Sequence, residues 1–418
     1  MRRWGPWLFL ACGWLLVAWL LVQLHRYSAA DYRALGGGPD IQAQLNWIGQ
    51  SLRQGGGEAT QIWYPEGYFF VHALYGLALV NQALLNPQND ALVALNRAEI
   101  KWVLAKLDSE AGRDPFSRGQ AIEYGVFYQG WRNRLLAGLL LITPAAERDA
   151  ALVEQFHSQS AALAQAFSKS PTHYLEAYPG QTWPVDNVVA LTSLKLHDQL
   201  YQTNYGEVVK AWLAYTKKHL DPSTGLIAHH IDAATGEILQ GSRGSSLVLA
   251  LSFLPELDVD FSREQYARYR ELYAQPVLDF VLTREYPHGV DGPMDVDSGP
   301  LVAGIGPVAS GVNLAPARAN GDDEIFERTL QLAETVGVAF TVNNEKRYSL
   351  GLLVAGDAFL VWSKSLVPWQ GAATPAPRHE YPRLTSANYL WTNLLAFLLA
   401  LAAFVPLLTR LKTAKKLR

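Results

Sequence analysis

The stretch WYPEGYFFVHALYGLALVNQALL, residues 63–85, decides how this chain folds. It begins with a short loop that contains an acid, a proline and a glycine. An apolar run, residues 70–85, follows the loop and contains no charged residue. A helix that is apolar on nearly all sides must be buried. The stretch therefore predicts a core helix with a polar loop at its N-terminus.

The same arrangement of loop and apolar run recurs six times along the chain. One residue marks each loop, and successive markers are 61, 59, 60, 54 and 51 residues apart: Trp63, Tyr124, Trp183, Arg243, Asp297 and Tyr348. The later apolar runs are GVFYQGWRNRLLAGLLLI, VDNVVALTSLKLHDQL, GSSLVLALSFLPEL, GPLVAGIGPVASGVNLAPA and SLGLLVAGDAFLVWSK. Self-similarity at a fixed period is typical of repeat architectures.

More polar, amphipathic stretches alternate with the apolar runs. They include 41–53 before the first run, and later DALVALNRAEIKWVLAKL, YGEVVKAWLAYTKKHL, FSREQYARYRELYAQPVLDFVL and DDEIFERTLQLAETVG. A helix with one apolar stripe covers a core rather than filling it. Six buried and six covering helices predict an all-α fold for residues 31–385, namely a six-hairpin (α/α)6 toroid with short β-hairpin excursions. A less regular all-helical bundle is the alternative.

In such a toroid all six inner helices start at the same end, so the marker loops converge there. Helix N-termini contribute unpaired N–H groups and partial positive charge. This end is therefore the expected binding site for a polar or anionic ligand. The acidic stretch REYPHGVDGPMDVDSGP, residues 284–300, becomes the fifth of the six rim loops.

The segment DPSTGLIAHHIDAATGEILQGSRGSS, residues 221–246, resembles the connection between the third and fourth hairpins of six-hairpin glycosidases. The resemblance, together with the sixty-residue period, concerns the architecture of 31–385 and includes no catalytic signature. It implies an extracytoplasmic carbohydrate-active enzyme, inverting or a lyase, with carboxylates at the wide end of the toroid.

Two charge-free stretches, 4–24 and 389–408, are each long enough to span a membrane as a helix. The tail 409–418 is basic, which places it in the cytoplasm under the positive-inside rule. Two spans return the N-terminus to the same side, so 31–385 is expected to be extracytoplasmic. The alternative for the first stretch is a signal peptide cleaved after Ser28-Ala29-Ala30.

Charge and cysteine content exclude several classes of protein. Seven of the 35 basic residues lie at the two ends, which leaves 28 against 38 acids. Nucleic-acid binding requires a basic surface and is therefore not expected. The only cysteine, Cys12, lies in the first apolar stretch, so the domain has no disulfide, thiolate metal site or cysteine nucleophile.

Glycoside cleavage needs one protonated and one ionised carboxyl group across a cleft. The rim loops offer six acids, namely Glu66, Glu123, Asp186, Glu285, Asp295 and Asp297. We expect Asp186 and Asp297 to be the working pair, with Asp295 or Glu285 in place of Asp297. The structural alternatives are an acid that stabilises a helix N-terminus, for Asp186, and turn-forming aspartates, for Asp295 and Asp297.

The remaining rim residues are assigned to substrate binding or to structure. Those expected to hold substrate are Arg243, Tyr128, Trp183, Tyr124, Tyr68 and Glu66. No cofactor is expected. An EF-hand starting at Asp295 would need a glutamate at loop position twelve, and that position is Gly306. Asp291, Asp295 and Asp297 could still form a calcium site of another kind. Of His229 and His230, one at most can face the cleft, and packing is the expected role.

Three classes of function fit these features. The first is an enzyme that hydrolyses or eliminates extracytoplasmic glycan. The second is a binding or assembly module that holds a glycan, lipid headgroup or partner on the same aromatic rim. The third is a toroid enzyme acting on terpenoids, although those known to us rely on cysteine or metal ligands in the cavity.

Overall fold

Helices dominate the computed structural model of the chain, which describes residues 38–370 and short pieces at 11–15, 17–19, 22, 393–394 and 397–398. Within these residues the strands form three separate two-stranded hairpins and no larger sheet. The expected all-α class is therefore confirmed.

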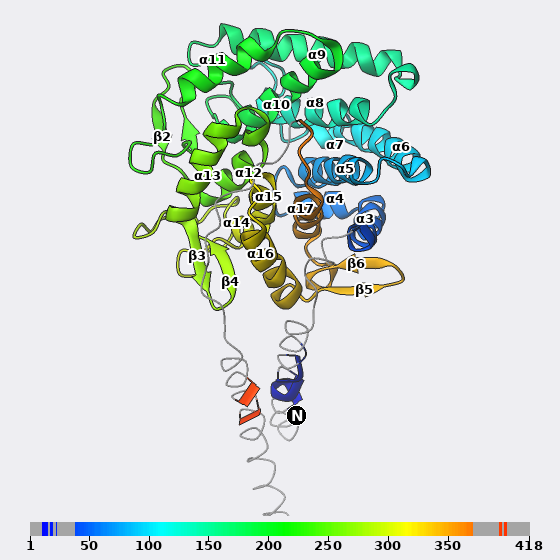
Figure 1. The fold of residues 1–418 in the computed structure, drawn as a ribbon, viewed down its shortest axis with the longest axis vertical. Coiled ribbons are helices and arrows are strands. Elements are labelled where there is room, and N and C mark those ends of the chain that lie inside the picture. Colours follow the sequence, from blue (N-terminus) through cyan, green and yellow to red (C-terminus); the bar gives the residue numbers. More distant parts are fainter. Residues whose placement is uncertain are drawn as a thin grey trace, which may run out of the picture.

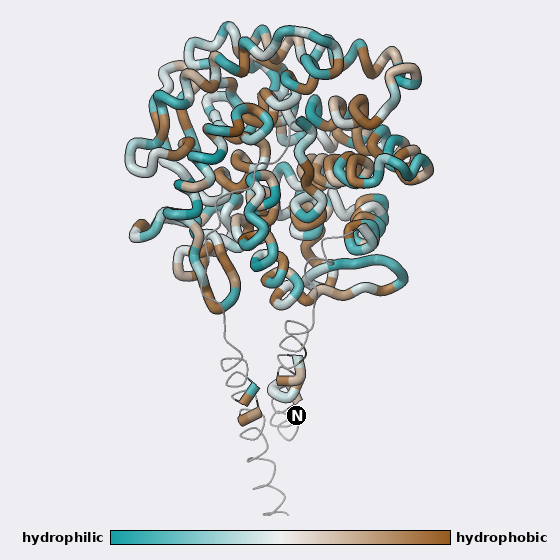
Figure 2. Tube along the Cα trace, viewed as in Figure 1, coloured by the Kyte–Doolittle hydropathy of each residue, from teal (hydrophilic) through white to brown (hydrophobic). Residues whose placement is uncertain are grey.

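The apolar runs form buried helices that contact one another in cyclic order. They are α5 (Gly67–Leu85), α8 (Gly125–Leu141), α10 (Pro184–Tyr201), α12 (Gly244–Phe253), the pair α14 (Pro307–Val312) and α15 (Leu314–Ala319), and α17 (Val354–Ser365). Each packs on the next, and α17 packs back on α5. Figure 1 shows these helices around the middle of the molecule, and Figure 2 shows their apolar character. The contacts thus close a ring.

Amphipathic helices cover this ring, as their single apolar stripe predicts. They are α3 (Gly38–Arg53), α6 (Asp90–Leu107), α9 (Ala150–Lys169), α11 (Gly206–Thr216), α13 (Val259–Tyr273) and α16 (Asp323–Val336). Four of them begin at an Asn or Asp whose side chain accepts a backbone N–H: Asn89, Asp149, Asp258 and Asp322. Such caps satisfy donors that a helix leaves unpaired. Short helices α4 (Gly56–Gln61) and α7 (Glu110–Arg113) fill two connections.

The expected starts of the last two inner helices, Gly299 and Ser349, are wrong. The fifth begins at Pro307, after a turn in which Val302 and Ile305 bridge each other. Pro suits the first helical position, and the glycines before it break the helix. The sixth begins at Val354, because Leu350 and Gly351 have left-handed backbone.

The hairpins confirm one expectation and correct another. Strands β1 (His230–Ile231) and β2 (Ile238–Gln240) form the expected excursion within 221–246. The covering helix expected to continue to Leu282 instead ends at Tyr273. Strands β3 (Ala274–Val277) and β4 (Phe280–Thr283) follow, because Pro276 cannot continue a helix. The third hairpin is β5 (Phe340–Val342) and β6 (Glu345–Arg347).

Only α5 among the described helices is long and apolar enough to span a membrane, and 89% of its apolar window is buried in the molecule. We therefore assign it to the core. The expected spans 4–24 and 389–408 lie outside the described residues apart from short helical pieces, and the tail 409–418 lies outside them entirely.

A buried ionic network joins the first covering helix, α3, to the last helix of the ring, α17, and we call it the seam. Lys364 of α17 donates to Asp40 of α3 at 2.7 Å, and Lys346 of β6 bridges Asp40 and Glu334. Gln44 of α3 donates to the backbone carbonyl of Asp357 at 2.9 Å. The seam thus links α3 to residues more than 300 positions further along the chain.

Candidate functional site

The marker loops place four of the expected site residues at helix starts. Glu66, Tyr124, Trp183 and Arg243 are the N-cap residues of α5, α8, α10 and α12. Asp186 lies in the first turn of α10. The loop that carries Asp295 and Asp297 runs between β4 and α14.

Asp186 is buried and lies under the influence of two other carboxylates. Its side chain is 5% exposed, and the Trp131 indole N–H donates to its Oδ1 at 3.2 Å. Burial raises the pKa of Asp186 to about 8, with further contributions from the charges of Asp297 and Glu66. Desolvation favours the neutral form of an acid, and so do neighbouring negative charges. At neutral pH Asp186 is therefore a protonated acid.

Asp297 titrates below Asp186. Burial raises its pKa to about 6, with contributions from Asp295 and Glu66, while Arg243 opposes the shift. Burial and the nearby charge of Asp297 raise the pKa of the Tyr64 hydroxyl. Glu66 accepts a short hydrogen bond from the Tyr178 hydroxyl. Three acids from three loops thus lie in one environment, in which burial and neighbouring charges raise the pKa values of Asp186 and Asp297.

Arg243 organises the other two acids. Its Nε donates to Glu285 Oε1 at 2.7 Å, and its Nη1 donates to Asp295. Glu285 is fully buried and also accepts from the Ser245 hydroxyl at 2.7 Å and the Ser245 backbone N–H at 3.1 Å. This bonding fixes Glu285 as an anchor for Arg243. Burial favours a raised pKa for Asp295, but the hydrogen bonds from Arg243 and Ser298 lower it.

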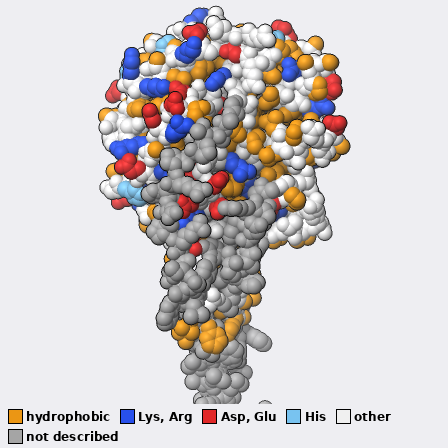
Figure 3. Space-filling model, in the orientation of Figure 1, with side chains coloured by type: hydrophobic (Ala, Val, Ile, Leu, Met, Phe, Trp, Pro, Cys, Tyr) orange, Lys and Arg blue, Asp and Glu red, His pale blue; other side chains and the backbone are white. Residues whose placement is uncertain are grey.

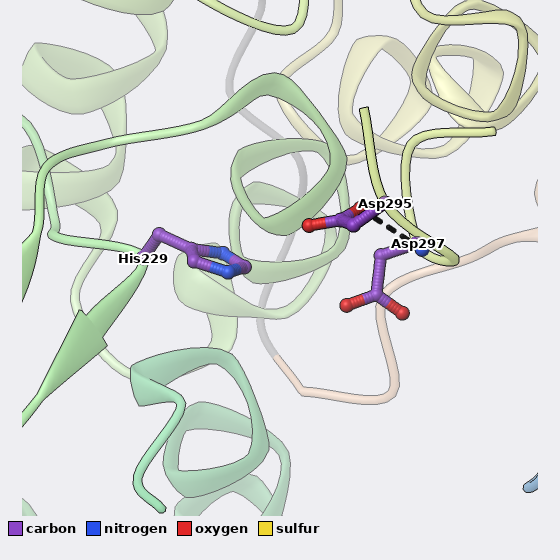
Figure 4. A group of neighbouring side chains, drawn as sticks. All are labelled: His229, Asp295 and Asp297. Carbon is purple, nitrogen blue, oxygen red and sulfur yellow. Dashed lines mark hydrogen bonds between the residues drawn. The ribbon is translucent and has the colours of Figure 1, made fainter. Parts of the chain in front are cut away.

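His229 faces these acids from the segment before β1. In Figure 4 its imidazole points toward Asp295 and Asp297, and one ligand atom from each of the three residues lies within 4.8 Å of the others. The Trp183 indole N–H donates to His229 Nε2 at 3.3 Å, and Nδ1 contacts the Ser246 hydroxyl. Burial, with the charge of Arg243, lowers the pKa of His229 to about 3.

Among the residues that the structure describes, these three side chains form the group that could bind a metal ion. A metal would have to replace the hydrogen bond from Trp183 or Ser246, since both His229 ring nitrogens already have partners. Asp291, included in the calcium alternative, is not in this group, and its 94% exposed carboxylate lies 3.6 Å from Arg284. His230 instead stacks on Trp183, with the rings 5.3 Å apart.

Three expected substrate-binding tyrosines lie in a different environment. Tyr128 is 2% exposed, donates to Asp108 Oδ1 at 2.9 Å and accepts from Arg113 at 3.2 Å. Tyr124 accepts from Arg118 at 3.0 Å, and Tyr68 packs on His72 with the rings 4.3 Å apart. The contacts given for these tyrosines are thus not with the site acids Asp186, Asp297 and Glu66. Glu123 pairs with Arg118 on the surface.

Other aromatic residues surround the acids instead. Trp131, which the sequence assigns to the core, contacts Asp186 and lies 5.0 Å from the ring of Phe70. Tyr178 donates a hydrogen bond to Glu66, and Tyr64 lies near the charge of Asp297. No spacing rule links Trp131 or Tyr64 to Asp186, because each comes from a different hairpin, whereas Tyr178 lies in the connection that leads into α10. The marker loops that contain Tyr64 and Tyr178 are the only sequence signal for them.

No known protein-family model matches the chain.

Proposed function

We propose that this chain is a membrane-anchored, extracytoplasmic glycoside hydrolase with the six-hairpin toroid fold, in which Asp186 is the general acid and Asp297 the general base. The cyclic packing of α5, α8, α10, α12, α15 and α17 supports the toroid. The two apolar stretches that flank the domain support the anchorage.

The observation that carries the proposal is the separation of two pKa values. Asp297 ionises near pH 6 and Asp186 near pH 8, so at pH 7 one is a base and the other an acid. A pair of carboxyl groups with separated pKa values is what acid–base cleavage of a glycoside requires. Asp297 accepts a proton from water, whose oxygen attacks the anomeric carbon. Asp186 protonates the departing glycosidic oxygen.

Hydrolysis fits this site better than elimination. A lyase removes the proton next to a uronate carboxylate, and a site for that reaction must neutralise the carboxylate's charge. Of the five acids of this site, Asp297 lies near Arg243, and Glu285 and Asp295 already pair with it. A uronate would meet repulsion at such a site.

The test is the pH profile of glycan cleavage by the full chain and two variants. Wild type is expected to give a bell with limbs near pH 6 and 8. Asp297→Asn is expected to remove the lower limb and Asp186→Asn the upper one. Each substitution is expected to lower the rate of glycan cleavage by roughly two or more orders of magnitude. Asp291→Asn, an exposed acid outside the group, is the matched control with unchanged activity. Full activity in both site variants contradicts the assignment.

Two alternatives remain, and the same variants separate them. The aromatic surroundings of Asp186, including Trp131 and Phe70, favour a terpenoid-type enzyme as the second candidate, because aromatic faces stabilise cations. Turnover of an isoprenoid alcohol but of no glycan, lost in Asp186→Asn, supports that class. Glycan binding without turnover, retained in both variants, supports a binding module.

A further inference from the structure

Two hairpins expose uncharged side chains at their tips on one side of the molecule. The turn Leu278–Asp279 joins β3 to β4, and the turn Asn343–Asn344 joins β5 to β6. The exposed residues of the two hairpins are Val277, Leu278, Thr341, Val342, Asn343 and Asn344, and none is charged. Figure 1 shows both hairpins on the same side, near the end of α16 and its 54% exposed Val336.

Leu278 is an unusual residue for its position. It is 65% exposed and has a φ of 56°. Left-handed backbone costs an L-residue energy unless it is Gly, Asn or Asp. The other hairpin follows this rule, because Asn343 and Asn344 have φ values of 52° and 60°. A leucine at the first tip is therefore unfavourable in water, both for its backbone and for its exposed side chain.

Short connections in the chain limit how far the tips can lie from a bilayer that holds the two expected spans. The expected spans are separated from the described domain by residues 25–37 and 371–388. At 3.3–3.6 Å per residue these connections reach at most about 50 and 65 Å. The described pieces 11–15, 393–394 and 397–398 lie on the hairpin side of the domain in Figure 1. They expose Leu15, Leu394, Phe397 and Leu398, as lipid-facing segments do.

Figure 3 shows basic and acidic side chains interspersed with apolar ones on the visible face of the domain. No single-sign patch there suggests an electrostatic partner. Apolar side chains at an interface between lipid and water are instead stabilised by partial burial among the headgroups.

We propose that the β3–β4 and β5–β6 tips, with Val336, rest in the headgroup region of the bilayer that holds the two spans. Leu278 and Val342 insert their side chains, while packing against the domain holds the hairpins in place. Strand β4 packs on α16, and β6 packs on α3 and contributes Lys346 to the seam. The inference rests on the proposed membrane anchorage and not on the reaction.

Cys12 is the only cysteine, so a Cys12→Ser background allows one probe at a time. An environment-sensitive fluorophore is attached at Leu278→Cys or Val342→Cys in the full chain, reconstituted in phosphatidylcholine and phosphatidylglycerol vesicles. Leu95→Cys on α6 is the matched control, because Leu95 is also apolar and 69% exposed. The probes at 278 and 342 are expected to show blue-shifted emission and quenching by spin-labelled lipid, and the probe at 95 neither.

A second variant tests whether the tips act together. Leu278→Asn and Val342→Asn in one chain, with the probe at Val336→Cys, are expected to return the probe to a solvent-like spectrum. If the chain floats with vesicles but the probe at 278 matches that at 95, docking is refuted and anchorage stands. If the chain does not float with vesicles, the anchorage fails and the docking inference fails with it.

Discussion

A carboxylic acid buried beside other acids has a consequence for stability as well as for chemistry. Asp186 has a folded pKa of about 8, whereas a free aspartate ionises near pH 4. Between these values the folded chain binds one proton more than the unfolded chain. Its contribution to stability is therefore complete below pH 4 and is lost as the pH rises toward 8.

Replacing Asp186 with Asn is expected to remove this pH dependence, because an amide keeps an acceptor for Trp131 and does not ionise. The stability of the variant relative to wild type is expected to rise between pH 5 and pH 8 by at least about 1.4 kcal/mol, the equivalent of one pKa unit. Melting temperatures in one detergent at pH 5, 6, 7 and 8 measure the difference. A gap that stays constant with pH, or that matches the gap for Asp291→Asn, contradicts the prediction.

At this scale the sequence predicts which residues stand at helix starts but not which of them meet. Asp186 follows Pro184 at the start of an apolar run, so its place in a first helical turn can be read directly. That Trp131 donates to it cannot, since the contact spans 55 residues and two helices. Tyr128 shows the same limit, because Asp108 and Arg113, which bind its hydroxyl, precede the marker loop.

Helix elements are specified by small residues as well as by apolar ones. Helices α8 and α10 approach so closely at Gly130 that an added Cβ would lie 2.9 Å from the Ala190 Cβ and 3.1 Å from its backbone. Gly311, within α14, has open space where a Cβ would stand. The two glycines form a matched pair of helical sites that differ in contact.

Gly130→Ala and Gly311→Ala are expected to change stability in opposite directions. Alanine favours a helix over glycine by about 1 kcal/mol, which Gly311→Ala gains. At Gly130 overpacking costs typically 1–3 kcal/mol and outweighs that gain. Thermal unfolding of both variants, compared with wild type, measures the signs. A Gly130→Ala chain at least as stable as wild type would show that α8 and α10 separate easily.

Helices are predicted correctly where the apolar pattern is long, and they are predicted wrongly where glycine or proline interrupts it. The first four inner helices begin within two residues of their expected starts at Phe69, Gly125, Val185 and Gly244. The fifth is broken by glycines and prolines, so the apolar run GPLVAGIGP predicts more helix than the backbone can form. The β3–β4 hairpin was missed because Pro276 and the left-handed Leu278 outweigh the helical pattern around them.

The molecule as a whole follows from the sixty-residue period, which predicts six repeats whose neighbours pack in order. The return of α17 to α5 is the part that a period alone does not specify. Beside it lie the polar residues of the seam, such as Asp40 and Lys364, whose partners have no regular spacing.

Topology across the membrane is a prediction at this scale. A reporter fused after Arg418 is expected to be active only in the cytoplasm, and one inserted near Thr235, between β1 and β2, only outside it. The reason is the basic tail and the pair of uncharged stretches. Alkaline phosphatase and green fluorescent protein fusions at both positions measure this. A cytoplasmic signal at 235 would place the domain on the other side.

The seam can form only late in the synthesis of the chain. Lys364 follows Asp40 by 324 residues, so a ribosome adding about 5–20 residues per second needs roughly 16–65 s to deliver the partner. Until then Asp40 and Gln44 lack their partners on α17, and the face of α5 that α17 later covers stays open. During this interval the ring of helices is open between α5 and the missing α17. The nascent chain is therefore exposed to misassembly until the last helix emerges.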